Sequence, residues 1–226
     1  MRLLLLSLAL VSARAQSRAP VLVELFTSEG CSSCPPADRL LEQLDSRVVV
    51  LSEHVDYWNH DGWKDPYSSH EWTERQERYG RIFNLQSAYT PEMIVDGESE
   101  FVGNDAARAS AEISRASRKK KAEIRLTRSE AGLHIEVTGS PSNADVFLAF
   151  AEDHGMNNVS AGENKGRQLR HVAMVRSLQK IGSVKRAAEF TRDIELPRSA
   201  EGKRVIVFVQ ESGPGRVDGA AVWPAQ

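Results

Sequence analysis

The sequence predicts an α/β unit followed by an antiparallel β-sandwich, and two observations lead to this fold class. Between residues 21 and 120, short apolar runs alternate with amphipathic segments, as in a chain that alternates strands and helices. After residue 121 the runs alternate polar and apolar residues and are separated by Gly, Pro and Asn turns. The 226 residues suffice for two small domains, and we expect one at residues 16–120 and one at residues 121–226.

The first strand is predicted at residues 21–26, a short apolar run that is rich in β-branched side chains. After a turn, the only two cysteines of the chain form the motif Cys31-x-x-Cys34. Pro35 then opens a helix, because proline is tolerated in the first helical turn. Cys31 is therefore expected at a helix N-terminus, where unpaired amides and the helix dipole favour a thiolate. This context indicates a redox-active pair.

Other interpretations of the two cysteines stay open. A structural disulfide that closes about four residues would contribute only ~2 kcal/mol in the chain-entropy model, against ~4.7 kcal/mol for a loop of ~100 residues. Zinc needs two more ligands, and His54 and His60 lie far beyond the usual spacing from Cys34. Copper could be held by both thiols and a histidine such as His54. A copper metallochaperone and a non-catalytic binding module therefore remain alternatives to an enzyme.

A second buried strand is predicted at residues 48–56. Strand, helix and strand in this order form a right-handed unit with parallel strands. Both strands then end at the same edge of the sheet, where open α/β folds place their sites. The loop at residues 57–66 leaves this edge, so Trp58 and Trp63 are expected to border the cysteines and to contact a substrate.

Three further elements complete the first half. A helix is expected from Ser69 to about residue 84. Asp96-Gly97 lies between two apolar runs and predicts an antiparallel hairpin. A last helix is predicted at residues 106–120, capped by Asn104 or Asp105, and its basic end is interpreted as a solvated helix terminus.

The second half is predicted to consist of strands. Residues 123–126 and 134–137 predict a hairpin around Ala131-Gly132. Four more strand-like runs follow, at residues 145–151, 169–175, 188–196 and 204–211. We find no catalytic constellation here, and His171 is interpreted as a packing or surface residue.

Charge and the N-terminus indicate where the protein acts. The formal net charge is −2, which does not suggest a nucleic-acid partner. Residues 1–15 combine Arg2, an apolar stretch and a small-x-small site, so they are predicted to be a signal peptide cleaved before Gln16. The apolar stretch is too short to span a bilayer, and no transmembrane segment is expected. A secreted or periplasmic location allows the cysteines to be oxidised.

The order of elements, with Cys31-x-x-Cys34 opening a helix and Thr90-Pro91 preceding a hairpin, resembles the thioredoxin fold over residues 20–120. The resemblance implies a cis Pro91 that faces the disulfide, and a groove lined by Thr90 and Pro91 that binds an extended substrate. We expect no cofactor and no metal ion. Glu29-Gly30 replaces the tryptophan that thioredoxin carries before its motif, and Ser32-Ser33 replaces Gly-Pro.

A closer resemblance is to a family of bacterial secreted proteins, the thioredoxin-like domain-of-unknown-function family 1223. It is carried by residues 24–38, 54–58, 62–66 and 89–91, and it continues into residues 162–167 and 175–176. The resemblance covers nearly the whole mature chain. It implies a fold and a location but no established substrate.

Together these observations predict a secreted or periplasmic thiol–disulfide oxidoreductase. Cys31 would attack a substrate disulfide and Cys34 would resolve the mixed disulfide. Glu24, the only acid of the first strand, is expected to be partly buried and to accept the Cys34 proton through a water, with Lys64 or His54 as the nearby cation. Removing an unpaired carboxylate there should leave stability unchanged or raise it. The expected partners are protein or small-molecule thiols and disulfides and a redox partner protein.

Overall fold

The computed structural model describes residues 19–60, 62–130 and 132–223. The first half contains β1 (Ala19–Thr27), α1 (Pro35–Leu44), β2 (Val48–His54), α2 (His70–Ile82), β3 (Glu92–Val95), β4 (Ser99–Val102) and α3 (Ala106–Ala116). The second half contains β5 (Glu123–Ser129), β6 (Gly132–Thr138), β7 (Ala144–Asn158), β8 (Gln168–Val184), β9 (Phe190–Glu195), the 3₁₀ helix η1 (Arg198–Ala200), β10 (Lys203–Gln210) and β11 (Val217–Trp223). In these described ranges, none of the helices has the length and apolar character needed to cross a membrane. The expected signal peptide at residues 1–15 lies outside the described residues.

The helices of the first half begin and end where short-range chemistry predicts. Ser69 caps α2, and its hydroxyl accepts a hydrogen bond from the amide of Glu71 at 3.3 Å. The chain leaves this helix through Asn84, whose φ of 55° lies in the left-handed region. Asp105 caps α3 by accepting a hydrogen bond from the amide of Arg108 at 2.9 Å. Both predicted helix starts are thereby confirmed.

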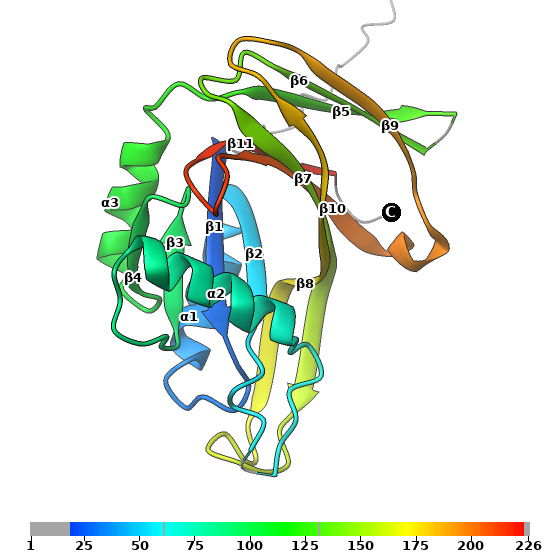
Figure 1. The fold of residues 1–226 in the computed structure, drawn as a ribbon. Coiled ribbons are helices and arrows are strands. Elements are labelled where there is room, and N and C mark those ends of the chain that lie inside the picture. The colour runs from blue at the N-terminus through cyan, green and yellow to red at the C-terminus, as the bar shows by residue number, and fades with distance from the viewer. Residues whose placement is uncertain (1–18, 61, 131, 224–226) are drawn as a thin grey trace, which may run out of the picture.

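The strands of the first half pair as predicted, and helices cover both of their faces (Figure 1). β1 pairs with β2 in parallel and with β3 in antiparallel fashion, and β3 and β4 form the hairpin at Asp96. Successive strand residues point to opposite faces. Phe26 packs edge-on against Tyr79 of α2, with ring centroids 6.1 Å apart, whereas Leu25 lies in the core with Ala37 of α1. Therefore α1 and α2 lie on opposite faces of the sheet.

One eight-stranded sheet runs through both halves of the chain. Its strand order is β11-β10-β7-β8-β2-β1-β3-β4. The junction is the parallel pairing of β8 with β2, where Ser52 is opposite Met174. Four strands after residue 121 therefore extend the first sheet, which corrects the expectation of a separate sandwich. The physical reason is that β2 is buried along its whole length and would otherwise leave an unpaired edge.

A second, smaller sheet confirms part of the sandwich prediction. β5, β6 and β9 form an antiparallel sheet in the order β5-β6-β9. Its buried residues join a core with those of β7, β8 and β10, so the second half does pack in two antiparallel layers (Figure 1). The core residues from β6 are Leu133, Ile135 and Val137, and those from β10 are Val205, Val207 and Val209.

The β7–β8 hairpin is much longer than predicted, with strands of 15 and 17 residues. Its outer part pairs Asn158 with Gln168, beyond the runs that alternate polar and apolar residues. The hairpin tip, residues 159–167, lies beside the segments that follow β1 and β2, at the lower end of Figure 1. This placement brings the second half of the chain to the cysteine motif.

Candidate functional site

Cys31 and Cys34 form a disulfide, with their Cα atoms 5.4 Å apart. Cys34 is the N-cap residue of α1, and its carbonyl accepts hydrogen bonds from the amides of Ala37 at 2.8 Å and Asp38 at 3.1 Å. A proline occupies the first turn of the helix. The predicted position of the cysteine pair, at the N-terminus of the first helix, is confirmed. A thiolate at this end of α1 would be favoured by the helix dipole.

The tip of the β7–β8 hairpin is tied to the backbone of the cysteine motif. The side-chain amide of Asn164 donates to the carbonyl oxygens of Glu29 and Cys31, both at 2.8 Å. The carboxylate of Glu163 accepts a hydrogen bond from the amide of Ser32 at 2.9 Å. Cys31 and Cys34 have no exposed surface. A reactant can therefore reach the sulfur atoms only after some of this covering moves.

The two predicted tryptophans also lie beside the motif. Trp58 Nε1 donates to Thr90 Oγ1 at 2.8 Å. A Cβ atom on Gly30 would lie 2.9 Å from both the Cβ and the carbonyl oxygen of Trp58, so only glycine allows this approach. Trp63 Nε1 donates to Glu29 Oε2 at 3.0 Å. The structure thus brings both tryptophans beside the cysteine motif, as the sequence predicts.

Thr90 and Pro91 lie on the remaining side. The Thr90–Pro91 peptide bond is cis, as the resemblance to the thioredoxin fold implies. The Ser33 hydroxyl links this segment to the disulfide, because it lies 3.3 Å from Cys31 Sγ and 3.5 Å from the carbonyl oxygen of Thr90. Thr90 is half-buried and Pro91 is buried.

Beneath the motif, His171 of β8 is buried between two carboxylates. Its Nε2 lies 3.1 Å from Glu29 Oε1, and its Nδ1 lies 3.8 Å from Asp38 Oδ1. Glu29 Oε1 also accepts a hydrogen bond from Asn157 at 2.8 Å, and Asp38 Oδ1 accepts one from Thr27 at 2.8 Å. His171 is buried, as a packing residue would be, but the sequence did not predict that it also lies between two carboxylates. The alternation of a strand indicates burial but not an ionic partner 142 residues away.

The ionic partners decide the charge of His171. Burial by itself would lower the pKa of the imidazole, because it disfavours the charged form. The carboxylates of Asp38 and Glu29, which lie beside the two ring nitrogens, outweigh burial and raise the pKa of His171 to about 10. This side chain is therefore an imidazolium at neutral pH.

His54 does not turn toward the cysteines. Its Nδ1 lies 2.7 Å from Asp65 Oδ2, and the same oxygen accepts a hydrogen bond from the amide of Glu29 at 2.8 Å. Burial would raise the pKa of Asp65, but the charge and hydrogen bond of His54 and the amides of Glu29 and Tyr67 lower it to about 2. Among the described residues, no group of three or more His, Cys, Asp or Glu side chains is arranged to hold a metal ion.

Glu24 lies in a different place from the one predicted. It is fully buried, but its cation is Arg75 of α2, rather than Lys64 or His54. Arg75 Nε donates to Glu24 Oε1 at 2.7 Å, and the Tyr79 hydroxyl donates to Glu24 Oε2 at 2.5 Å. These contacts are on the α2 face, whereas the cysteines open α1 on the opposite face. The expected proximity of Glu24 to Cys34 therefore needs correction.

Two more buried acids share the α2 face with Glu24. Glu53 Oε1 lies 3.2 Å from Arg75 Nε, but neither carboxylate oxygen makes a hydrogen bond within the described residues. Burial and the nearby charge of Glu24 raise the pKa of Glu53 well above its usual value. Glu92 accepts a hydrogen bond from Gln76 at 2.6 Å, and burial raises its pKa to about 7. This group is called the α2-face cluster below, after its members Glu24, Glu53, Glu92 and Arg75.

Sequence reasoning missed four residues of the site: Glu29, Asp38, Asn164 and His171. The first three lie inside the segments that carry the family resemblance, at residues 24–38 and 162–167, and this was the signal that could have found them. His171 lies in none of those segments. Its role depends on the pairing of β8 with β2, which no local pattern indicates.

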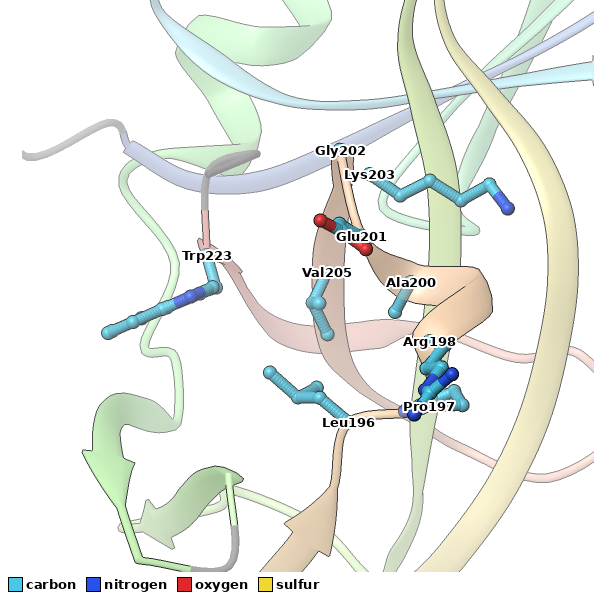
Figure 2. Close-up of a pocket in the computed structure, with 9 residues that line it drawn as sticks. All are labelled: Leu196, Pro197, Arg198, Ala200, Glu201, Gly202, Lys203, Val205 and Trp223. Atoms are coloured by element: carbon cyan, nitrogen blue, oxygen red, sulfur yellow. The ribbon is translucent and has the colours of Figure 1, made fainter.

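A separate hollow of about 290 Å³ lies at the β9–β10 connection (Figure 2). Leu196, Val205 and the ring of Trp223 supply its apolar lining, and Arg198, Glu201 and Lys203 are at its rim. All of its lining residues come from the last thirty residues or so of the chain. It has no part in the cysteine site.

The fold and the site define a class of mixed α/β proteins that bury a Cys-x-x-Cys disulfide at a helix N-terminus. The chain belongs to the family described as protein of unknown function (DUF1223), whose model matches residues 22–210. The resemblance to family 1223 is thereby confirmed. Among curated proteins, no sequence matches the chain.

Two solved structures resemble this one. The crystal structure of protein AGR_C_4864 from Agrobacterium tumefaciens is 30% identical in sequence, with a TM-score of 0.80, over 94% of this chain and 97% of that chain. HBP35 of Porphyromonas gingivalis is 16% identical, with a TM-score of 0.52, over 92% of this chain and 76% of that chain. The likeness to HBP35 shows a shared fold alone.

Proposed function

We propose that the protein is a secreted or periplasmic thiol–disulfide oxidoreductase whose first half is a thioredoxin-like module. The observation that carries the proposal is the Cys31–Cys34 disulfide at the N-terminus of α1. A disulfide that closes so short a loop contributes only ~2 kcal/mol to stability in the chain-entropy model. A helix N-terminus lowers the pKa of a cysteine that precedes it. Reactivity explains the motif better than structural support does.

The chemistry exchanges one disulfide for another. The Cys31 thiolate attacks a substrate disulfide, forms a mixed disulfide and releases one substrate thiolate. The Cys34 thiolate then attacks the Cys31 sulfur, releases the second substrate thiolate and restores the Cys31–Cys34 bond. Two electrons pass from the cysteine pair to the substrate, and the same steps in reverse oxidise a substrate dithiol.

The surrounding residues have separate roles in this proposal. Thr90 and Pro91 line the approach to Cys31, with Trp58 holding the Thr90 side chain through its indole N–H. Ser33 donates or accepts at the Cys31 sulfur. Trp63 acts on the other side by fixing the carboxylate of Glu29. A thiol or disulfide substrate, free or within a protein, would enter between these residues.

Equilibration with glutathione redox buffers tests the proposal. The purified protein should exchange its disulfide with glutathione. A reduction potential of about −120 mV would indicate an oxidant, and one of about −270 mV would indicate a reductant. A Cys34→Ser variant should show a Cys31 pKa below about 8.5 in its thiolate absorbance. A protein that never exchanges its disulfide, or a Cys31 pKa at or above that value, would contradict the proposal.

A further inference from the structure

The two carboxylates that hold His171 come from opposite sides of the cysteine motif. Glu29 lies two residues before Cys31. Asp38 lies one helical turn after Cys34, on the same side of α1, since residues four apart in a helix are neighbours. His171 lies within 3.1 Å of one carboxylate and 3.8 Å of the other. The imidazolium is therefore placed beneath the disulfide by the same short segment that carries it.

We propose that His171 is a positioning residue of the redox site, a buried cation that sets the balance between the Cys31–Cys34 disulfide and its reduced form. This role rests on the thiol–disulfide chemistry proposed above. The contacts of His171 are with Glu29 and Asp38, so it acts on the disulfide through the charges and the geometry of these two residues. No such cation is part of the sequence motif itself, since His171 comes from β8.

The charge balance of the cluster gives the direction of the effect. Glu29 and Asp38 supply two negative charges, and His171 offsets one of them. Reduction creates a Cys31 thiolate close to this cluster, where solvent is excluded and charges interact more strongly than in water. With His171 charged, the thiolate meets one net negative charge instead of two. The cation therefore stabilises the reduced form and makes the disulfide easier to reduce.

Other titratable groups face His171 from every neighbouring element. The His54 ring of β2 lies 4.7 Å from the His171 ring, and the Tyr67 ring lies 5.7 Å away. Asp65 Oδ2 lies 2.7 Å from His54 Nδ1 and also accepts a hydrogen bond from the amide of Glu29. Burial raises the pKa of Tyr67, so its hydroxyl stays neutral. These groups leave the ionic pairing of His171 with Glu29 and Asp38 as the dominant charge contact.

Two hollows border the cluster. His171 lines one of about 320 Å³ together with Met156 and Arg170. Asp38 lines a neighbouring one of about 230 Å³ that also includes Pro35, the residue after Cys34. Residues of α1 and β8 line both hollows. The His171 side chain itself has no exposed surface, so its charge acts inside the protein, where charges interact more strongly than in water.

A His171→Gln variant tests the proposal, with His154→Gln as the matched control, because His154 is an exposed histidine of the same hairpin. The first measurement is the equilibrium constant with glutathione. Loss of the cation should shift it about tenfold toward the disulfide, since a single nearby charge moves a cysteine pKa by one to three units. The second measurement is the Cys31 pKa in a Cys34→Ser background, which should rise by about one unit. His154→Gln should change neither.

An Asp38→Asn variant should shift the glutathione equilibrium in the opposite direction, which a general folding defect would not do. It keeps an acceptor for the Thr27 hydroxyl but removes one negative charge. We expect it to shift the glutathione equilibrium toward the dithiol and to lower the Cys31 pKa. If both variants move the equilibrium in the same direction, or if His171→Gln changes it less than twofold, the proposal is overturned.

The two proposals fail in different ways. If the wild-type disulfide does not exchange with glutathione, the proposed oxidoreductase function fails. The Cys31 pKa of the Cys34→Ser protein still measures the influence of His171 in that case. If the wild-type protein exchanges but the two variants do not differ in sign, only the role of His171 fails.

Discussion

The two buried ionic clusters of this protein lie near the same strand, β1, and differ in how their charges are matched. The α2-face cluster places the carboxyl groups of Glu24 and Glu53 around the guanidinium of Arg75, and Gln76 donates to the third carboxyl group, that of Glu92. The cluster beneath the cysteines places the carboxylates of Glu29 and Asp38 around His171. In the first, Glu53 lacks any hydrogen bond within the described residues, whereas Glu29 accepts bonds from several donors.

This difference shows two ways of keeping acids inside a protein. On the α2 face, burial raises the pKa of Glu53 and Glu92, so part of the negative charge is removed by protonation. Beneath the cysteines, hydrogen-bond donors and the His171 side chain surround the carboxylates. The first arrangement should make the free energy of unfolding depend on pH. The second is the one that we propose acts on the disulfide. Four substitutions separate these roles.

Removal of Arg75 should have the largest effect. Arg75→Met leaves Glu24 buried without its cation, so the free energy of unfolding should fall by about 3–5 kcal/mol. Urea unfolding followed by tryptophan fluorescence measures it. Arg81→Met, at the exposed end of the same helix, is the control and should stay within about 0.5 kcal/mol. A loss under about 1 kcal/mol for Arg75→Met would mean that the cluster is already neutral without the cation.

Glu92 should give the next largest effect, and one that depends on pH. Its pKa is about 7 in the folded protein, against an ordinary value of 4.5. Between these two pH values, Glu92 therefore keeps its proton in the folded state and loses it in the unfolded state. Stability therefore falls as pH rises from 4.5 to about 7, by up to about 3 kcal/mol.

Glu92→Gln should remove that fall, because a neutral amide can still accept the hydrogen bond from Gln76. The variant should match wild type near pH 4 and exceed it above pH 7, in unfolding curves recorded across this range. Glu77→Gln, on the exposed side of α2, serves as the control. Parallel pH profiles for the variant and the wild type would contradict the assignment.

Substitution of Asn164 tests the covering of the disulfide, and its effect should be moderate. Asn164→Ala removes two hydrogen bonds to the cysteine motif, each contributing about 0.5–1.5 kcal/mol. Opening of the hairpin tip should become easier, and dithiothreitol should reduce the disulfide about tenfold faster. Asn158→Ala removes a surface contact with Gln168 on the same hairpin and should leave the rate unchanged. Equal rates for all three proteins would show that the tip does not limit access.

Glu24 should have the smallest effect on the redox step. Because it pairs with Arg75 on the face opposite α1, Glu24→Gln should change the decay of a preformed mixed disulfide less than twofold. Its stability should fall, since the variant loses a buried ion pair, whereas an unpaired carboxylate would have predicted no loss. Stopped-flow decay between pH 6 and 9 measures the first quantity. A strong slowing would restore Glu24 as the proton acceptor for Cys34.

Elements that depend on neighbouring residues were predictable. The two apolar runs form β1 and β2, and Ser69 caps α2. Asp96 lies in the turn of the β3–β4 hairpin. The cysteine pair and both tryptophans lie together because each follows the end of a parallel strand. In these places a few adjacent side chains determine the local structure.

Elements that depend on distant pairing were not predictable. Nothing in residues 168–184 indicates a parallel partner at Ser52, and the polar outer part of the hairpin hides its length. The ionic role of His171 follows only once β8 lies beside β2. Likewise, Glu24 was expected near Cys34 because the sequence shows which face of the strand it occupies, but not which helix covers that face.

The pairing of β8 with β2 also has a consequence for how the protein is made. The cysteines emerge early in synthesis, more than a hundred residues before the strand that completes their surroundings. A nascent chain that ends near residue 121 would have β2 as an open edge and Glu29 and Asp38 without their cation. In such a chain the thiols are therefore open to the solvent before the hairpin closes over them. Maturation of the site waits for the last third of the chain.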